Sequence, residues 1–363
     1  MSNIQQLLAT RKLPELLQFQ DGAPVKTTAD WQLRRREILE IFQQNEFGFL
    51  PPAPQCVYCD SWETDERFCA GNAPLTKLAL HAELANGKAF TFPVYQVIPK
   101  ADKPLPAFIH ISFRADMPDR YMPGEEICDN GFALFSFCYQ DITRDNADFA
   151  DGLAEYFCTA RETNPASPGK IALWAWAAMR VMDYIETLPQ IDQTRVAVVG
   201  HSRLGKTALF AGAMDERFAL TISNDSGCGG AALSRSKTGE NIADICRAFP
   251  FWFCKNYQNF AEKETNAPFD QHFLLACMAP RGLYAASASE DAWADPTSEF
   301  LACAAASEVW ALFGKAGLSH QDRPPQSGED YPNGCIGYHL RSGCHYFSRY
   351  DWIRYMRFLR GMA

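Results

Sequence analysis

The chain has 363 residues and a formal net charge of -9, and 47% of its residues are hydrophobic. Because a surface that follows phosphates needs a basic excess, nucleic acid is not an expected partner. No apolar run approaches the roughly 20 residues that cross a bilayer, so no membrane partner is expected. The first residues, MSNIQQLLATRKLPELL, lack the pattern of a signal peptide, which favours a cytoplasmic location. The oligomeric state is left open.

The first predicted element is a helix over residues 29–48, ADWQLRRREILEIFQQNEFG. Its apolar residues fall on one face at helical spacing, namely Trp31, Ile38, Ile41 and Phe42. Arg34, Arg35 and Arg36 are expected to face solvent. This helix belongs to an N-terminal helical extension of about residues 1–55, which ends at the prolines of FLPPAP.

The chain then changes from strand-like segments to alternating strands and helices. The first three segments, LTKLALHAEL, AFTFPVYQVIPK and PLPAFIHISF, read as an antiparallel lead-in. After them, apolar strands such as RVAVVG, ALTISND and GLYAASAS alternate with apolar helices. This order predicts an α/β fold, a three-layer sandwich of the α/β-hydrolase type with a mostly parallel central sheet. Residues 1–363 are expected to form a single domain.

The 13 cysteines are an odd number and lie mostly in apolar segments. They are typical of buried thiols in a reducing compartment. Cys56 and Cys59 form a CxxC pair, but no second pair or HxxxH follows at zinc-ligand spacing, so no metal site is expected.

The strongest motif surrounds Ser202, where the strand VAVVG runs into GHSRLG and then an apolar helix. A serine at the apex of such a strand-to-helix turn is typical of the nucleophile of a serine esterase. The same residues, Gly200 to Thr207, also match the phosphate-binding pattern GxxxxGK[ST], so a P-loop nucleotide binder is an alternative. The esterase interpretation is favoured because an acid and a histidine follow in hydrolase order.

Two acids and one histidine are candidates for the partners of Ser202. His345 follows the Ser342–Gly343 turn and is the preferred base, whereas His339 lies in the apparent strand CIGYHL and is expected to be a packed core residue. Asp291 follows the strand GLYAASAS, and Asp225 follows the strand ALTISND. Either carboxylate is suited to orient the histidine, and the sequence leaves both open.

Taken together, the motifs resemble the glucuronoyl esterases, carbohydrate esterase family 15, and in particular the bacterial members. The resemblance rests on GHSRLGKTAL, SNDSGCGGAALSR, PFDQHFLLACMAPRGLY, SASEDAWADP and GYHLRSGCH. It implies a hydrolase for esters of (4-O-methyl-)glucuronic acid, as in lignin-carbohydrate or glucuronoxylan linkages, that needs no cofactor or metal. It also implies the following roles: Ser202 as nucleophile, His345 as base, Arg203 as oxyanion donor through side chain and backbone, and Lys206, Glu240 and Trp293 as binders of the uronate ring.

The chain departs from the fungal pattern at two positions near the motif. His201 stands where fungal members have a half-cystine, and Asp225 stands where they have glutamate. The shorter acid has less reach, which gives Asp291 more weight. Three alternative functions stay open: an acetylxylan or other carbohydrate carboxylesterase, a catalytically weak carbohydrate-binding relative, which the uncertain acid suggests, and the P-loop nucleotide binder.

Overall fold

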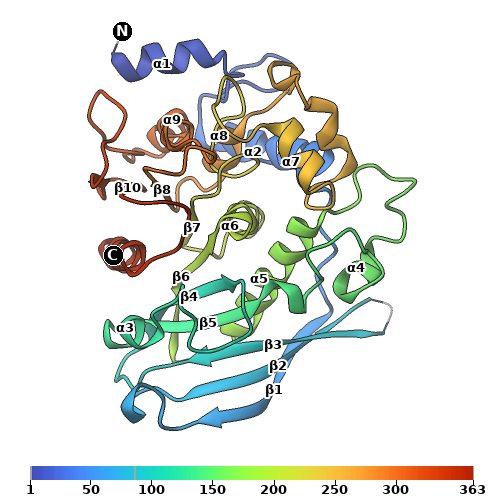
Figure 1. Cartoon of the computed structure of the whole chain (residues 1–363), viewed down its shortest axis with the longest axis vertical. Coiled ribbons are helices and arrows are strands. Elements are labelled where there is room, and N and C mark those ends of the chain that lie inside the picture. The colour runs from blue at the N-terminus through green and yellow to red at the C-terminus, as the bar shows by residue number, and fades with distance from the viewer. Residues whose placement is uncertain (1, 86, 363) are drawn as a thin grey trace.

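The computed structural model describes residues 2–85 and 87–362. In this part of the chain, ten strands form one sheet in the order β1-β2-β3-β5-β4-β6-β7-β8-β10-β9, as Figure 1 shows. The strands are β1 (Cys56–Asp65), β2 (Leu75–Glu83), β3 (Ala89–Val97), β4 (Leu105–Ser112), β5 (Ala133–Cys138), β6 (Ile191–His201), β7 (Leu220–Asn224), β8 (Gly282–Ala288), β9 (Asp330–Tyr331) and β10 (Ile336–Arg341).

The centre of the sheet is parallel and its two margins are antiparallel. Strands β5, β4, β6, β7, β8 and β10 pair in parallel, whereas β1, β2 and β3 form an antiparallel ribbon and β9 pairs antiparallel with β10. The predicted antiparallel lead-in is therefore correct for β2 and β3 but wrong for the segment PLPAFIHISF, which forms β4. This segment is buried from Ala107 to Ser112, as a strand of a covered parallel sheet must be.

Helices cover both faces of the sheet and give the predicted three layers. The α-helices are α1 (Asn3–Arg11), α2 (Thr28–Phe42), α3 (Gly124–Asp129), α4 (Gly152–Phe157), α5 (Lys170–Ile185), α6 (Arg203–Met214), α7 (Ile242–Ala248), α8 (Gln271–Ala276), α9 (Pro296–Ala306), α10 (Glu308–Leu312) and α11 (Arg349–Gly361). Helices α3 and α11 share an apolar core with one sheet face, and α5, α6, α8 and α9 share a core with the other. Successive residues of β4 point to opposite faces of the sheet, so Phe108 belongs to one of these cores and Ile109 to the other.

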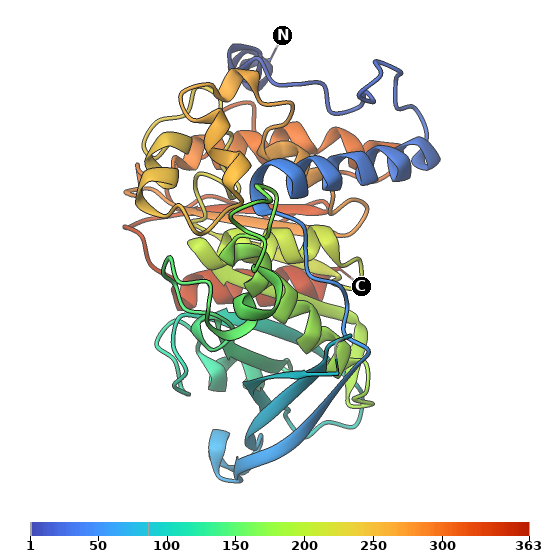
Figure 2. The same cartoon turned by 90° about the vertical axis from the view of Figure 1, so that its right-hand side faces the viewer.

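The N-terminal helices pack across the end of the molecule that is opposite the β1–β3 ribbon, as Figure 2 shows. Trp31, Ile38 and Phe42 of α2 are buried as predicted, but the expectation that Arg34 and Arg35 face solvent is wrong. The guanidinium of Arg35 donates to the carbonyl oxygen of Cys277 at 2.9 Å and to that of Ala213 at 2.5 Å. Arg35 is buried because its polar end satisfies carbonyl groups at the ends of α6 and α8. Arg34 donates to the carbonyl oxygen of Leu16 and forms an ion pair with Glu37.

Each of the 13 cysteines is a free thiol in the described chain, and most of them are buried. Cys56 and Cys344 are exceptions because both are exposed. No helix among the described residues combines the length and the hydropathy that a membrane crossing needs.

Candidate active site

Ser202 occupies a sharp turn between β6 and α6. Its backbone adopts φ 58° and ψ -127°, a strained conformation for a residue with a side chain. The amide of Ser202 donates to the carbonyl oxygen of Asn224 at 2.8 Å, and the amide of Gly205 donates to that of Ser202 at 2.9 Å. The turn therefore fixes the serine at the carboxyl end of the parallel strands, directly before the amino end of a helix.

The two glycines of the GxSxxG motif lie where the turn packs closely. A Cβ atom on Gly200 would overlap the carbonyl oxygen of Leu204. A Cβ atom on Gly205 would lie 3.0 Å from the Oγ atom of Ser223 and from the Cβ atom of Ser226. The departure from GxSxG therefore keeps the steric requirement of the elbow, with the second small residue one position later.

His345 lies in the loop after β10, as predicted, and forms a pair with Asp291. Its Nδ1 atom donates to Oδ2 of Asp291 at 2.6 Å, and Asp291 follows β8. Because Nδ1 carries the shared proton, Nε2 is the nitrogen that is free to accept another. Burial alone would raise the pKa of Asp291, but the hydrogen bond and the charge of His345 outweigh it and lower this pKa. The carboxylate thus stays ionised beside the imidazole.

Asp225 is paired with an arginine and not with the histidine. Its Oδ2 atom accepts from Nη2 of Arg341 at 3.0 Å, and its backbone has a left-handed φ of 44°. Burial and repulsion from Glu299 raise the pKa of Asp225, and Arg341 opposes this rise. The structure therefore brings both candidate acids to the site, and it places Asp291 in hydrogen-bond contact with His345.

Ligand atoms of Asp225, Asp291 and His345 all lie within 4.8 Å of one another, a spacing that a metal ion can bridge. Two of the three groups are already engaged with each other, since His345 bonds to Asp291. The third group faces the cation Arg341. This arrangement suits a proton-transfer pair better than a cation site.

The other two histidines of this region have structural surroundings. The ring of His201 lies 4.5 Å from that of His345, and its Nδ1 atom donates to Oδ1 of Asn224 at 2.7 Å. Burial and repulsion from His345 lower the pKa of His201 to about 3, so this ring is a neutral support. His339 is fully buried and bonds to Asp351 at 2.8 Å, which confirms that it is a packed core residue.

Ser202 and His345 open into a cavity of about 320 Å³. Its lining also includes the three predicted uronate-binding residues and two aromatic residues, namely Lys206, Glu240, Trp293, Phe249 and Trp252. The Nζ atom of Lys206 donates to the carbonyl oxygen of Ser226, which leaves protons for a further acceptor. Burial lowers the pKa of Lys206, and the charge of Glu240 opposes this. Trp293 is 57% exposed and forms a flat wall at the rim.

Sequence reasoning missed Phe249 and Trp252, which line this cavity, and Asp145, which holds the side chain of Arg203. The rings of Phe249 and Trp252 stack at 3.8 Å with an interplanar angle of 1°, and the guanidinium of Arg203 lies 4.5 Å from the Trp252 ring centroid. Arg203 also forms an ion pair with Asp145. The segments TRDNADF and AFPFWFC contain these residues, but neither has a motif that marks it as part of a site.

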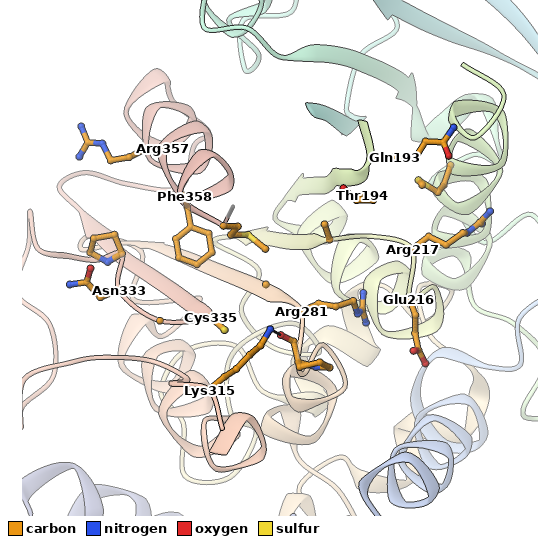
Figure 3. A pocket seen from close by; sticks show the side chains of 18 of the residues that line it. Gln193, Thr194, Glu216, Arg217, Arg281, Lys315, Asn333, Cys335, Arg357 and Phe358 are labelled. Atoms are coloured by element: carbon orange, nitrogen blue, oxygen red, sulfur yellow. Dashed lines mark hydrogen bonds between the residues drawn. The ribbon is translucent and has the colours of Figure 1, made fainter. Parts of the chain in front are cut away.

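A larger cavity, of about 870 Å³, lies at the amino ends of the parallel strands, opposite the catalytic cavity (Figure 3). Ala219 and Gly282, which line it, lie at the amino ends of β7 and β8, whereas Asp225 and Asp291 follow the carboxyl ends of these strands. Arg281 in this cavity donates to four main-chain oxygens and so has a structural role. Ligands of α/β sheets bind outside the carboxyl ends of the strands, which favours the smaller cavity as the active site.

A strained serine between a parallel strand and a helix, with a histidine–carboxylate pair in the same cavity, is the arrangement of α/β-hydrolase enzymes, and the fold is that of this class. The family model described as fungal glucuronyl esterase matches residues 83–314. A carbohydrate esterase from an unknown prokaryotic organism is 34% identical over 95% of this chain and 88% of its own length. The chain belongs to the glucuronoyl esterase family, whose members are carboxylic ester hydrolases.

Solved structures agree with this membership. A glucuronoyl esterase from Solibacter usitatus is 34% identical, with a TM-score of 0.87 over 96% of this chain and 97% of that one. A promiscuous esterase of carbohydrate esterase family 15 from a marine bacterial metagenome is 32% identical, with a TM-score of 0.88 over 97% of each chain. A glucuronoyl esterase from Sporotrichum thermophile, solved in complex with methyl 4-O-methyl-β-D-glucopyranuronate, is 26% identical with a TM-score of 0.71 over 97% of this chain and 88% of that one. The GKT match to a phosphate-binding loop is therefore a coincidence of spacing.

Proposed function

We propose that the protein hydrolyses esters of the carboxyl group of glucuronic or 4-O-methylglucuronic acid. The observation that carries the proposal is the cavity in which Ser202 and the His345–Asp291 pair face Lys206 and Glu240. The neighbouring charges of these last two residues suit the hydroxyl groups of a sugar, which both donate and accept hydrogen bonds. A methyl uronate ester bound to the Sporotrichum thermophile relative supports the same acyl group.

The proposed reaction begins when Nε2 of His345 takes the proton of Ser202 as its Oγ atom attacks the ester carbonyl carbon. Asp291 stabilises the imidazolium, and the amide of Arg203 at the start of α6 and the Arg203 side chain stabilise the oxyanion. The tetrahedral intermediate expels the alcohol, which takes the proton from His345. Water, deprotonated by His345, then attacks the acyl-serine and releases the uronic acid and Ser202.

Asp291 is the acid of this proposal because it holds His345 at 2.6 Å, whereas Asp225 is paired with Arg341. The pairing of His345 with Asp291 argues against a catalytically weak relative, since that alternative was suggested by the doubtful acid. A carbohydrate acetyl esterase is the second candidate function, because the marine metagenome relative is a promiscuous esterase.

The test compares methyl and benzyl glucuronate with an acetylated xylose as substrates of the wild type and of Ser202→Ala. We expect a preference for the uronate esters and a loss of turnover of about 10⁶-fold in Ser202→Ala. Ser327→Ala, which changes an exposed loop serine, is the matched control. Undiminished cleavage by Ser202→Ala would overturn the mechanism, and a preference for the acetyl ester would overturn the substrate assignment alone.

A further inference from the structure

We infer that Asp145 is a positioning residue for Arg203 and that it acts on the oxyanion only through this guanidinium. The inference rests on the proposed function, because it needs an oxyanion beside Ser202. The residues that line the catalytic cavity include Arg203 but not Asp145. Asp145 lies behind the cavity wall, in the segment between β5 and α4.

The carboxylate of Asp145 is the meeting point of three parts of the chain. Its Oδ2 atom accepts hydrogen bonds from Nη1 of Arg203 and, at 2.9 Å, from the hydroxyl of Tyr139. Its Oδ1 atom accepts from Nε1 of Trp252 at 2.7 Å. The Asp145 side chain is only 10% exposed. One carboxylate therefore fixes both the guanidinium and the indole on which this guanidinium lies.

The segment that carries Asp145 is itself held firmly. Trp174 of α5 donates through Nε1 to the carbonyl oxygen of Thr143 at 3.0 Å. The fully buried Lys170 donates to Oγ1 of Thr143 at 2.5 Å and to Oδ1 of Asp151 at 3.1 Å. Because α5 packs against α6, the frame that fixes the segment also carries the helix that begins at Arg203. Asp145 is thus a rigid anchor and not a mobile surface acid.

Asp145 does not engage every donor of the Arg203 guanidinium. Its Nε atom is buried and has no hydrogen-bond partner among residues 2–85 and 87–362. A guanidinium carries five N–H donors, and Asp145 engages it through Nη1, so donors remain for an oxygen atom of a substrate bound in the cavity that Arg203 lines. With Nη1 held by Asp145, the long side chain does not have to lose rotational freedom during the reaction. Preorganised donors of this kind are those that stabilise a developing oxyanion.

The experiment is a double-mutant cycle with Asp145→Asn, Arg203→Met and the double variant, in which kcat and KM are measured. Asparagine keeps the size of the side chain and an acceptor for Trp252 but removes the charge that holds Arg203. We expect kcat to fall about 100-fold in Arg203→Met and about 10-fold in Asp145→Asn, with little change in KM. The double variant should be no slower than Arg203→Met, because the effect of Asp145 then has no route to the oxyanion.

Multiplying effects in the double variant, or an unchanged kcat in Asp145→Asn, would overturn the inference. Asp148→Asn, in the same segment, should keep the wild-type kcat, and thermal melting checks that each variant folds. Arg203→Leu, which is also uncharged, takes the place of Arg203→Met if the latter does not fold. The cycle is measured with p-nitrophenyl acetate beside methyl glucuronate. Hydrolysis of every ester passes through an oxyanion, so the coupling between Asp145 and Arg203 can be measured with either substrate. A wild-type enzyme that does not prefer methyl glucuronate would contradict the proposed function without affecting that measurement.

Discussion

Arg341 donates from Nη2 to Oδ2 of Asp225 at 3.0 Å, and the same nitrogen donates to the carbonyl oxygen of Cys344 at 3.0 Å. It also donates to the carbonyl oxygen of Tyr346. The guanidinium therefore binds the acid that follows β7 and the backbone on both sides of His345. Asp225 serves here as the counter-ion of a group that shapes the histidine loop, while Asp291 bonds to the histidine itself.

The first prediction separates the roles of these two acids. Asp291→Asn should lower kcat about 10³- to 10⁴-fold, because the imidazole loses its orienting and stabilising charge. Asp225→Asn should lower kcat much less and act mainly through the fit of the loop around Arg341. Steady-state kinetics with methyl glucuronate measures both effects. A larger loss of kcat in Asp225→Asn than in Asp291→Asn would contradict the assignment.

The second prediction concerns the exposed wall of the cavity. Trp293→Ala should raise KM for methyl glucuronate about five-fold, equivalent to about 1 kcal/mol for a lost aromatic contact. The melting temperature should hardly change, because Trp293 is 57% exposed. Exposed Tyr58, at the far end of the sheet, offers a matched control in Tyr58→Ala. An unchanged KM in Trp293→Ala would remove this residue from the binding site.

The third prediction concerns Glu46, which is fully buried and accepts from Nε2 of Gln271 at 3.0 Å. Burial raises the pKa of Glu46 to about 8, whereas its ordinary value is 4.5. Between these two values the unfolded chain has released a proton that the folded chain retains. The free energy of unfolding therefore falls as the pH rises from about 4.5 to about 8.

Glu46→Gln removes this contribution, so the melting temperature of the variant should fall less over that pH range, by roughly 5 °C. Calorimetry between these pH limits measures the difference. Glu162→Gln is the control, because the Glu162 side chain is 87% exposed. Parallel curves for Glu46→Gln and the wild type would show that Glu46 is ionised in the folded state.

The fourth prediction tests the elbow. Gly200→Ala should destabilise the protein by about 3 kcal/mol or more, because the new methyl group overlaps the carbonyl oxygen of Leu204. Gly314→Ala is a control for a glycine with no atom in the way, although its φ of 67° brings a smaller cost. Urea unfolding measures both. Equal stability losses at the two positions would contradict the steric account of the motif.

The parts of the structure that local patterns determine were predictable from the sequence. The turn at Ser202, the alternation of strands and helices after β4 and the loop position of His345 follow from residues that are close in the chain. The choice of acid did not follow, because it depends on Arg341, which lies 116 residues from Asp225. Asp145 was missed for the same reason, since its bond to Trp252 spans 107 residues. The cytoplasmic location and the single-domain organisation stay predictions.

Helical periodicity was also an incomplete guide to burial. It identified the apolar face of α2 but gave no sign that Arg34 and Arg35 lie under other elements. The carbonyl oxygens that receive Arg35 belong to Ala213 and Cys277, at the ends of α6 and α8. Periodicity describes one helix, whereas burial of its polar face depends on where other helices end.

The exposed position of Trp293 has a consequence for directed evolution. The residue stands on a loop at the rim, while a Cβ atom on Gly200 would overlap backbone atoms of Leu204. Libraries that randomise Trp293 should therefore yield many folded clones, whereas most members of a library at Gly200 should fail to fold. Selection can therefore change substrate preference at Trp293, whereas a side chain at Gly200 would prevent the turn at Ser202 from folding.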